Sequence, residues 1–163
     1  MTLDPKALAW LAPLFLACGG GDLCDRTFEP FPDHVTGRVV SGTNRTWLHA
    51  MELYREGDFE EAADSLAVYM RMPGYIRTAH LYLAMCKLAM DEPYEAELHL
   101  DHLRNSNLWA YQDQWEWYAV VCWTCSGQLD RALEGAEAIA TRKHTYQGEA
   151  GRLVQELRME QGR

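Results

Sequence analysis

Apolar residues recur three or four positions apart in successive segments of the chain, and short polar or glycine-containing stretches separate these segments. The first segment follows Asn44 and Thr46, either of which can cap a helix, runs through Trp47 and Leu48, and ends at Gly57. The same pattern predicts helices over residues 59–70, 75–90, 93–104, 111–126, 129–141 and 146–160. The sequence therefore predicts an all-α protein in which consecutive helices pair as hairpins.

Three of the predicted turns are related in sequence, which indicates an internal repeat. They read GDFEEA from Gly57, DEPYEA from Asp91 and GQLDRA from Gly127. The closing alanines at positions 62, 96 and 132 are 34 and 36 residues apart, and a period near 34 residues is typical of stacked helix–turn–helix units. Each alanine lets the two helices of a unit approach closely. Such units build binding surfaces rather than reaction centres.

Aligned on these turns, the chain resembles tetratricopeptide-repeat (TPR) proteins of the divergent bacterial, membrane-associated lipoprotein type. The resemblance covers about residues 28–160 and includes small or apolar residues at matched helix positions: Ala50, Ala84, Val120, Ala62, Ala96, Ala132, Leu66, Leu100 and Ala136. It implies a right-handed α-solenoid of about three hairpins over residues 45–160, closed by a C-terminal capping helix. It also implies a non-catalytic scaffold that binds proteins within a larger assembly. The second turn departs from the pattern because it lacks a glycine.

Residues 1–25 are interpreted as a signal, lipid-anchor or tether segment. The apolar run over residues 7–17 would be about 16 Å long as a helix, too short for a hydrocarbon core of roughly 30 Å. The sequence LAC ending at Cys18 resembles a bacterial lipobox, which implies a membrane anchor at Cys18 and a place in the cell envelope facing the periplasm. In the alternatives the run is a buried helix, with the protein in the cytoplasm, or the remnant of a longer anchor.

Residues 26–44 are predicted to form an extended arm, because they contain two prolines and two glycines and show no helical period. Phe28, Phe31 and Val35 are expected to hold the arm along the first hairpin.

Composition and motifs narrow the function classes. The net charge of −9 over 163 residues argues against nucleic-acid binding, which needs clustered Lys and Arg to neutralise phosphates. The sequence has no phosphate-binding glycine loop, no Gly-x-Ser-x-Gly elbow and no His-Glu-x-x-His motif. We therefore expect no enzymatic activity, no cofactor and no small-molecule substrate, and we expect protein partners together with the membrane.

Cys122 and Cys125 form a CxxC pair at the predicted end of a helix, where the helix dipole disfavours a thiolate. The favoured interpretation is that both are small residues filling the contact between hairpins. The alternative function is a thiol-redox or metal-binding protein that uses this pair. A disulfide between Cys122 and Cys125 is a further alternative. Cys86 lies within an apolar helical segment and is expected to be buried.

His99 and His102 lie three residues apart on one predicted helix and could bind a metal together with Asp101 or Glu95. Such a pair more often forms a solvated helix face, so no metal site is predicted. His49, His80 and His144 show no informative spacing.

In the resembled family the first helices of the hairpins line a concave groove. Aromatic and methionine side chains there suit an apolar helix or an extended peptide, and Tyr54 is expected near the open end. A short array can instead use the same residues as core, or cover them with its own arm and act as a spacer. The residues concerned are Trp47, Met51, Tyr54, Leu81, Met85, Leu88 and Trp117.

Overall fold

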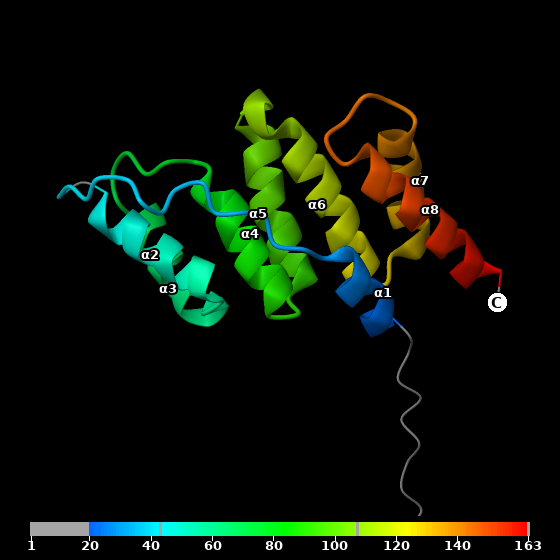
Figure 1. Cartoon of the computed structure of the whole chain (residues 1–163), viewed down its shortest axis with the longest axis horizontal. Coiled ribbons are helices and arrows are strands. Elements are labelled where there is room, and N and C mark those ends of the chain that lie inside the picture. The colour runs from blue at the N-terminus through cyan, green and yellow to red at the C-terminus, as the bar shows by residue number, and fades with distance from the viewer. Residues whose placement is uncertain (1–19, 43, 107, 163) are drawn as a thin grey trace, which may run out of the picture.

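The computed structural model describes residues 20–42, 44–106 and 108–162, and this part of the chain is helical and contains no strand (Figure 1). The all-α prediction is confirmed. The short 3₁₀ helix η1 (Trp109–Tyr111) precedes α6. The α-helices are α1 (Gly20–Thr27), α2 (Arg45–Glu56), α3 (Phe59–Met70), α4 (Ala79–Ala89), α5 (Pro93–Asn105), α6 (Gln112–Cys125), α7 (Leu129–Ala140) and α8 (Gln147–Gln161).

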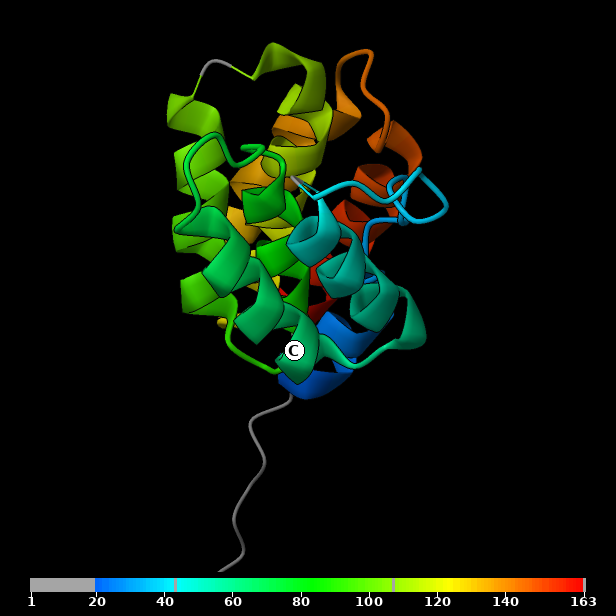
Figure 2. The same ribbon diagram turned by 90° about the vertical axis from the view of Figure 1, so that its left-hand side faces the viewer.

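Consecutive helices pack in chain order. The pairs α2–α3, α4–α5 and α6–α7 form hairpins, α3–α4 and α5–α6 join neighbouring hairpins, and α8 packs on α7. Figure 1 shows this row from the side, and Figure 2 shows the later helices stacked behind the first hairpin. The three closing alanines, Ala62, Ala96 and Ala132, are fully buried, as close approach of paired helices requires.

The three hairpin turns share one backbone conformation. Gly57, Asp91 and Gly127 have φ of 86°, 59° and 74°. In each turn the next amide donates to the carbonyl five residues earlier, at 3.0, 2.9 and 2.8 Å. Glycine adopts this left-handed conformation at least cost, and aspartate is among the few other residues that tolerate it. The missing glycine therefore leaves the second turn unchanged in form.

Helix α4 begins at Ala79, four residues later than predicted. The preceding residues form turns, and the Ile76 amide donates to the Tyr69 hydroxyl at 2.9 Å. This bond holds the connection between the first two hairpins in a non-helical conformation, although residues 75–78 continue the helical sequence pattern.

Helix α1 shows that the end of the segment interpreted as a signal, lipid anchor or tether is ordered. Gly20–Thr27 is helical and packs on α6, Leu23 is buried, and Cys24 forms a disulfide with Cys125. The Arg26 guanidinium also lies 3.3 Å from the Glu156 carboxylate of α8. Contacts with α6 and α8, which are distant in the sequence, thus order α1 although it begins with two glycines. The predicted signal run and the Cys18 anchor lie outside the described residues. Among those described, no helix combines the length and apolar character needed to cross a bilayer.

The arm, residues 28–42, runs from α1 back across the first helices of all three hairpins to the start of α2 (Figure 1). One tyrosine from each first helix bonds to its main chain. Tyr118 of α6 donates to the Glu29 carbonyl at 2.9 Å, and Tyr54 of α2 donates to the Phe31 carbonyl at 2.6 Å. Tyr82 of α4 accepts from the His34 amide at 3.4 Å.

The side chains of the arm follow the prediction in part. Phe31 and Val35 are buried and Phe28 is partly buried against the core. The prediction named only the first hairpin, whereas the arm contacts all three hairpins.

Candidate functional site

The seven residues predicted to line a concave groove are all buried, none more than 5% exposed. The arm lies over this face, and its aromatic rings pack on one another. The ring centroid of Tyr82 lies 5.7 Å from that of Trp47 and 5.2 Å from that of Tyr54. Tyr54 is therefore not at an open end, which corrects that expectation. Because the array is short, the apolar and aromatic residues of this face form part of the core, and the arm lies on them. The residues concerned are Trp47, Met51, Tyr54, Leu81, Met85, Leu88 and Trp117.

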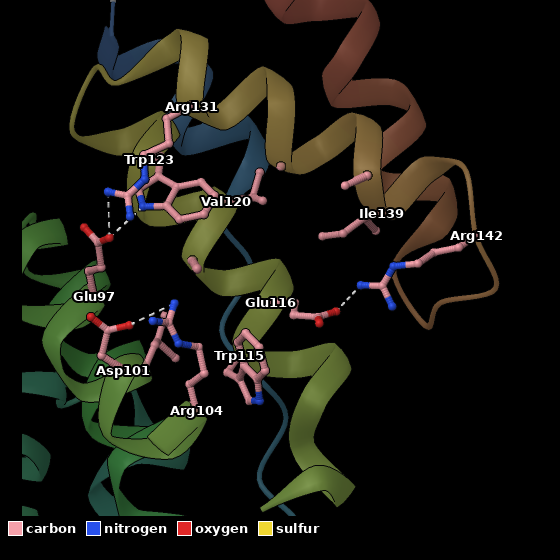
Figure 3. A pocket seen from close by; sticks show the side chains of 14 residues that line it. Glu97, Asp101, Arg104, Trp115, Glu116, Val120, Trp123, Arg131, Ile139 and Arg142 are labelled. Carbon is pink, nitrogen blue, oxygen red and sulfur yellow. Dashed lines mark hydrogen bonds and ion pairs between the residues drawn. The ribbon is translucent and has the colours of Figure 1, made fainter. Parts of the chain in front are cut away.

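An open pocket lies on a different surface, between α5, α6 and α7, and we call it the α5–α7 groove (Figure 3). Its volume is about 210 Å³. The apolar part is formed by aliphatic and small side chains and two tryptophans, and the rim by three arginines and three carboxylates. The lining residues are Leu100, Ala119, Val120, Gly135, Ala138, Ile139, Trp115, Trp123, Arg104, Arg131, Arg142, Glu97, Asp101 and Glu116.

The charges of the rim are paired within the groove, as the dashed lines of Figure 3 show. Arg131 lies 2.9 Å from the Glu97 carboxylate, and Arg104 lies 3.6 Å from that of Asp101. Arg142 pairs with Glu116. Ion pairs whose arginine is largely exposed contribute roughly 0–1 kcal/mol each to stability. Their main effect is to hold both signs of charge at fixed places around an apolar floor.

Trp123 connects the second and third hairpins at one end of the groove. Its Nε1–H donates to Glu97 at 2.7 Å, and the Arg131 guanidinium lies 4.2 Å from its ring centroid. The ring lies against Gly135 of α7, where a Cβ would be only 2.7 Å from Trp123 and from Val120. Glycine at this position is therefore a packing requirement, which the sequence pattern did not reveal.

We expect Gly135→Ala to destabilise the fold and to disturb Trp123. Overpacking costs about 1–3 kcal/mol, and the better helix propensity of alanine offsets roughly 1 kcal/mol of this. Gly151→Ala in α8 is the matched control, because its new Cβ meets nothing within 4 Å. Urea unfolding should show a lower midpoint for the first variant and an equal or higher one for the second. Equal midpoints for both would contradict the close packing of Trp123 on Gly135.

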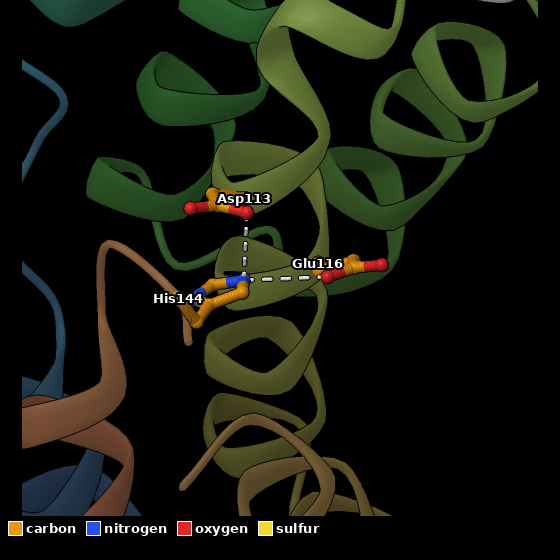
Figure 4. Close-up of side chains that lie close together, drawn as sticks. All are labelled: Asp113, Glu116 and His144. Atoms are coloured by element: carbon orange, nitrogen blue, oxygen red, sulfur yellow. Dashed lines mark ion pairs between the residues drawn. The ribbon is translucent and has the colours of Figure 1, made fainter. Parts of the chain in front are cut away.

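A second polar cluster joins α6 to the loop before α8 (Figure 4). The buried His144 Nε2 lies 3.2 Å from Glu116 and 3.5 Å from Asp113. Asp113 Oδ2 accepts from the Thr145 hydroxyl at 2.6 Å and the Thr145 amide at 2.7 Å. These bonds, the hydroxyl above all, hold the pKa of Asp113 below its usual value. Within the described ranges, no other group of three His, Cys, Asp or Glu residues has its donor atoms within 4.8 Å of one another.

The hydrogen bonding of His144 disfavours a metal in this cluster. The Tyr146 amide donates to His144 Nδ1 at 3.1 Å, so the proton of the neutral ring is at Nε2. A metal at Nε2 needs the opposite tautomer, with the proton at Nδ1. The cluster is therefore best explained as a clasp that fixes the loop between α7 and α8.

Cys122 is buried as the favoured packing interpretation expects, whereas Cys125 has a role that neither interpretation of the CxxC pair included. Cys125 is bonded to Cys24, 101 residues away, and not to Cys122. Cys122 and Cys86 are free and buried, and burial raises the pKa of both thiols, that of Cys86 to about 12. In this structure Cys122 and Cys125 therefore form neither a disulfide with each other nor a pair of free thiols. The burial expected for Cys86 is confirmed.

His99 and His102 of α5 lie beside His80 of α4, a residue that sequence spacing did not indicate. The Nδ1 atoms of His80 and His99 are 3.2 Å apart, and the rings of His80 and His102 stack at 4.8 Å. The signal was absent from the sequence because His80 belongs to the other helix of the hairpin.

No family model, curated protein or solved structure matches this chain.

Proposed function

We propose that the chain is a non-catalytic protein-interaction scaffold, built as a right-handed solenoid of three TPR-like hairpins with α8 as its cap. The observation that carries this proposal is the open α5–α7 groove, with an apolar floor, two tryptophans and a fixed rim of paired charges. Large aromatic residues beside charged rims are the usual centres of protein interfaces. The repeated turn geometry supports the TPR-like arrangement.

The groove also limits the chemistry of the partner. A volume of about 210 Å³ accepts one or two bulky apolar side chains rather than a whole helix. Arginines and carboxylates alternate around it, so the segment that binds should carry charges of both signs beside its apolar residue. We therefore propose a partner protein with one exposed apolar anchor, and no nucleic acid or small-molecule substrate.

The partner surface proposed here differs from the concave face that the resemblance implies. The arm already covers that face, and its three tyrosine hydrogen bonds would have to break before another segment could bind. The α5–α7 groove needs no such rearrangement. The arm thus has the role of an internal tie, and the partner contact moves to the outer side of the second and third hairpins.

The disulfide supports the proposed location in the bacterial cell envelope. Structural disulfides form and persist in oxidising compartments such as the periplasm and are rare in the cytosol. Membrane attachment through Cys18 remains part of the proposal and depends on the sequence alone. Thiol-redox or metal chemistry at Cys122 and Cys125 is not favoured, because Cys125 is already bonded to Cys24.

The proposal predicts that Trp115→Ala weakens partner binding about tenfold or more, because a half-buried aromatic anchor is lost from the groove. Trp109→Ala is the matched control, since Trp109 is 67% exposed and does not line the groove. Neither variant should change the midpoint of thermal unfolding by more than a few degrees.

The measurement is site-specific photo-crosslinking in membranes of the native host. A photoreactive side chain at Arg104 should give a discrete adduct, which mass spectrometry identifies and whose purified form gives the affinities. The same group at Val68, exposed on α3 and outside the groove, should give none. Adducts of equal yield at both positions, or equal affinity of both tryptophan variants, would count against the groove.

A further inference from the structure

Three imidazole side chains meet at one end of the α4–α5 hairpin. His80 is 8% exposed, and its Nδ1 lies 3.2 Å from Nδ1 of His99. The exposed His102 stacks on the His80 ring with centroids 4.8 Å apart. These residues are not part of the α5–α7 groove, and nothing in the proposed scaffold function uses them.

We propose that His80, His99 and His102 form a binding site for a transition-metal ion of the Zn²⁺ class. Two nitrogens bound tetrahedrally to zinc at about 2.05 Å are about 3.3 Å apart, which matches the separation of the two Nδ1 atoms. Imidazole ligands suit Zn²⁺, Cu²⁺ and Ni²⁺ and do not suit Mg²⁺ or Ca²⁺. In this structure only the His80 and His99 nitrogens are in place, because the three rings do not bring their donor atoms within 4.8 Å of one another. His102, whose exposed side chain stacks on His80, would supply the third nitrogen by rotation, and water would complete the site.

The surroundings of His80 favour the tautomer that a metal needs. The Tyr75 hydroxyl lies 3.3 Å from His80 Nε2. In the metal-free protein one Nδ1–H donates to the other Nδ1. Binding moves that proton to Nε2 of the same ring, and His80 Nε2–H then donates to the Tyr75 oxygen. Tyr75 is thus a positioning residue behind the ligand, and no net proton release is required near neutral pH.

Imidazole binds a metal in its neutral form, and the surroundings of the paired rings favour that form. Burial, followed by the neighbouring imidazoles, lowers the pKa of His80 to about 4, and burial, followed by the proximity of His102, lowers the pKa of His99. A cavity of about 310 Å³ opens beside the cluster, and His80 and His102 line it. Arg77 also lines this cavity, and it is turned toward the Ser106 carbonyl, to which it donates at 3.1 Å.

The test is titration of untagged, chelator-treated full-length protein with Co²⁺ followed by displacement with Zn²⁺. We expect one equivalent of Co²⁺, a visible absorption band of tetrahedral intensity, and loss of that band when one equivalent of Zn²⁺ is added. Saturating Zn²⁺ should also raise the unfolding temperature, because the metal binds only the folded hairpin.

Variants locate the site. His99→Ala and His80→Ala should each weaken Zn²⁺ binding at least tenfold, and Tyr75→Phe about tenfold. His102→Ala should weaken binding and shift the Co²⁺ band. His49→Ala, an exposed histidine on α2, is the matched control and should change nothing. If His80→Ala does not fold, the Zn²⁺ affinities of His99→Ala and Tyr75→Phe test the site instead. Absence of stoichiometric binding, or full binding in His99→Ala, would overturn the proposal without affecting the scaffold function.

Discussion

Replacing Cys125 with serine is expected to lower the free energy of unfolding by about 3–5 kcal/mol, the largest effect we predict for a single change. The disulfide with Cys24 joins residues 101 positions apart, and opening so long a loop returns much conformational entropy to the unfolded chain. The substitution also frees α1, whose buried Leu23 then loses its fixed position on α6. Urea unfolding in the absence of reductant measures the difference.

Reductant provides the control for this prediction. Dithiothreitol should lower the urea midpoint of the wild-type protein to that of Cys125→Ser and leave the variant unchanged. Cys122→Ala, which removes a free buried thiol, should keep its sensitivity to reductant. A wild-type midpoint that stays the same while thiol titration shows full reduction would mean that α1 is held by packing alone.

Tyr82→Ala is expected to cost about 3–5 kcal/mol, the second-largest effect. Tyr82 is 3% exposed, and its ring centroid lies 5.9 Å from Phe31 of the arm and 5.7 Å from Trp47 of α2. Removal of an aromatic ring from such a position leaves a cavity that the surrounding side chains fill only partly. The loss should appear as a lower midpoint in both thermal and urea unfolding.

Tyr82→Phe separates the ring from its hydroxyl. This variant loses only the bond from the His34 amide, and it should cost about 1 kcal/mol. Limited proteolysis gives a second measurement, because Tyr82→Ala should make the arm susceptible to cleavage, whereas Tyr82→Phe should not. Equal stability of the two variants would show that the ring contributes little to holding the arm.

The same variants test which surface binds the partner. Cys125→Ser frees α1, from which the arm starts, and Tyr82→Ala loosens the arm farther along its path, while neither variant replaces a residue that lines the α5–α7 groove. Partner affinity measured under conditions where both variants are folded should therefore match that of the wild-type protein. An affinity that rises in both would place the partner on the inner face, in competition with the arm, and would overturn the assignment of the groove.

The sequence by itself determined most of α2 to α8 and the pairing of consecutive helices. Helical spacing of apolar residues and three related turns specify local structure, since both depend on residues within a few positions of one another. For this reason the predicted helix over 59–70 matches α3 and the turns at Gly57 and Gly127 are where they were expected. Even the second turn, without glycine, follows the repeat because Asp91 adopts the same conformation.

Only the tertiary structure decided what these helices expose. The course of the arm over all three hairpins turned a predicted groove into core, because the apolar residues that suit a partner suit the chain's own segment equally well. The partner of Cys125 is equally invisible in sequence, since it lies 101 residues away in a segment interpreted as a signal, lipid anchor or tether. The α5–α7 groove and the meeting of His80 with His99 likewise join residues of different helices, and such distances are set by packing rather than by spacing along the chain.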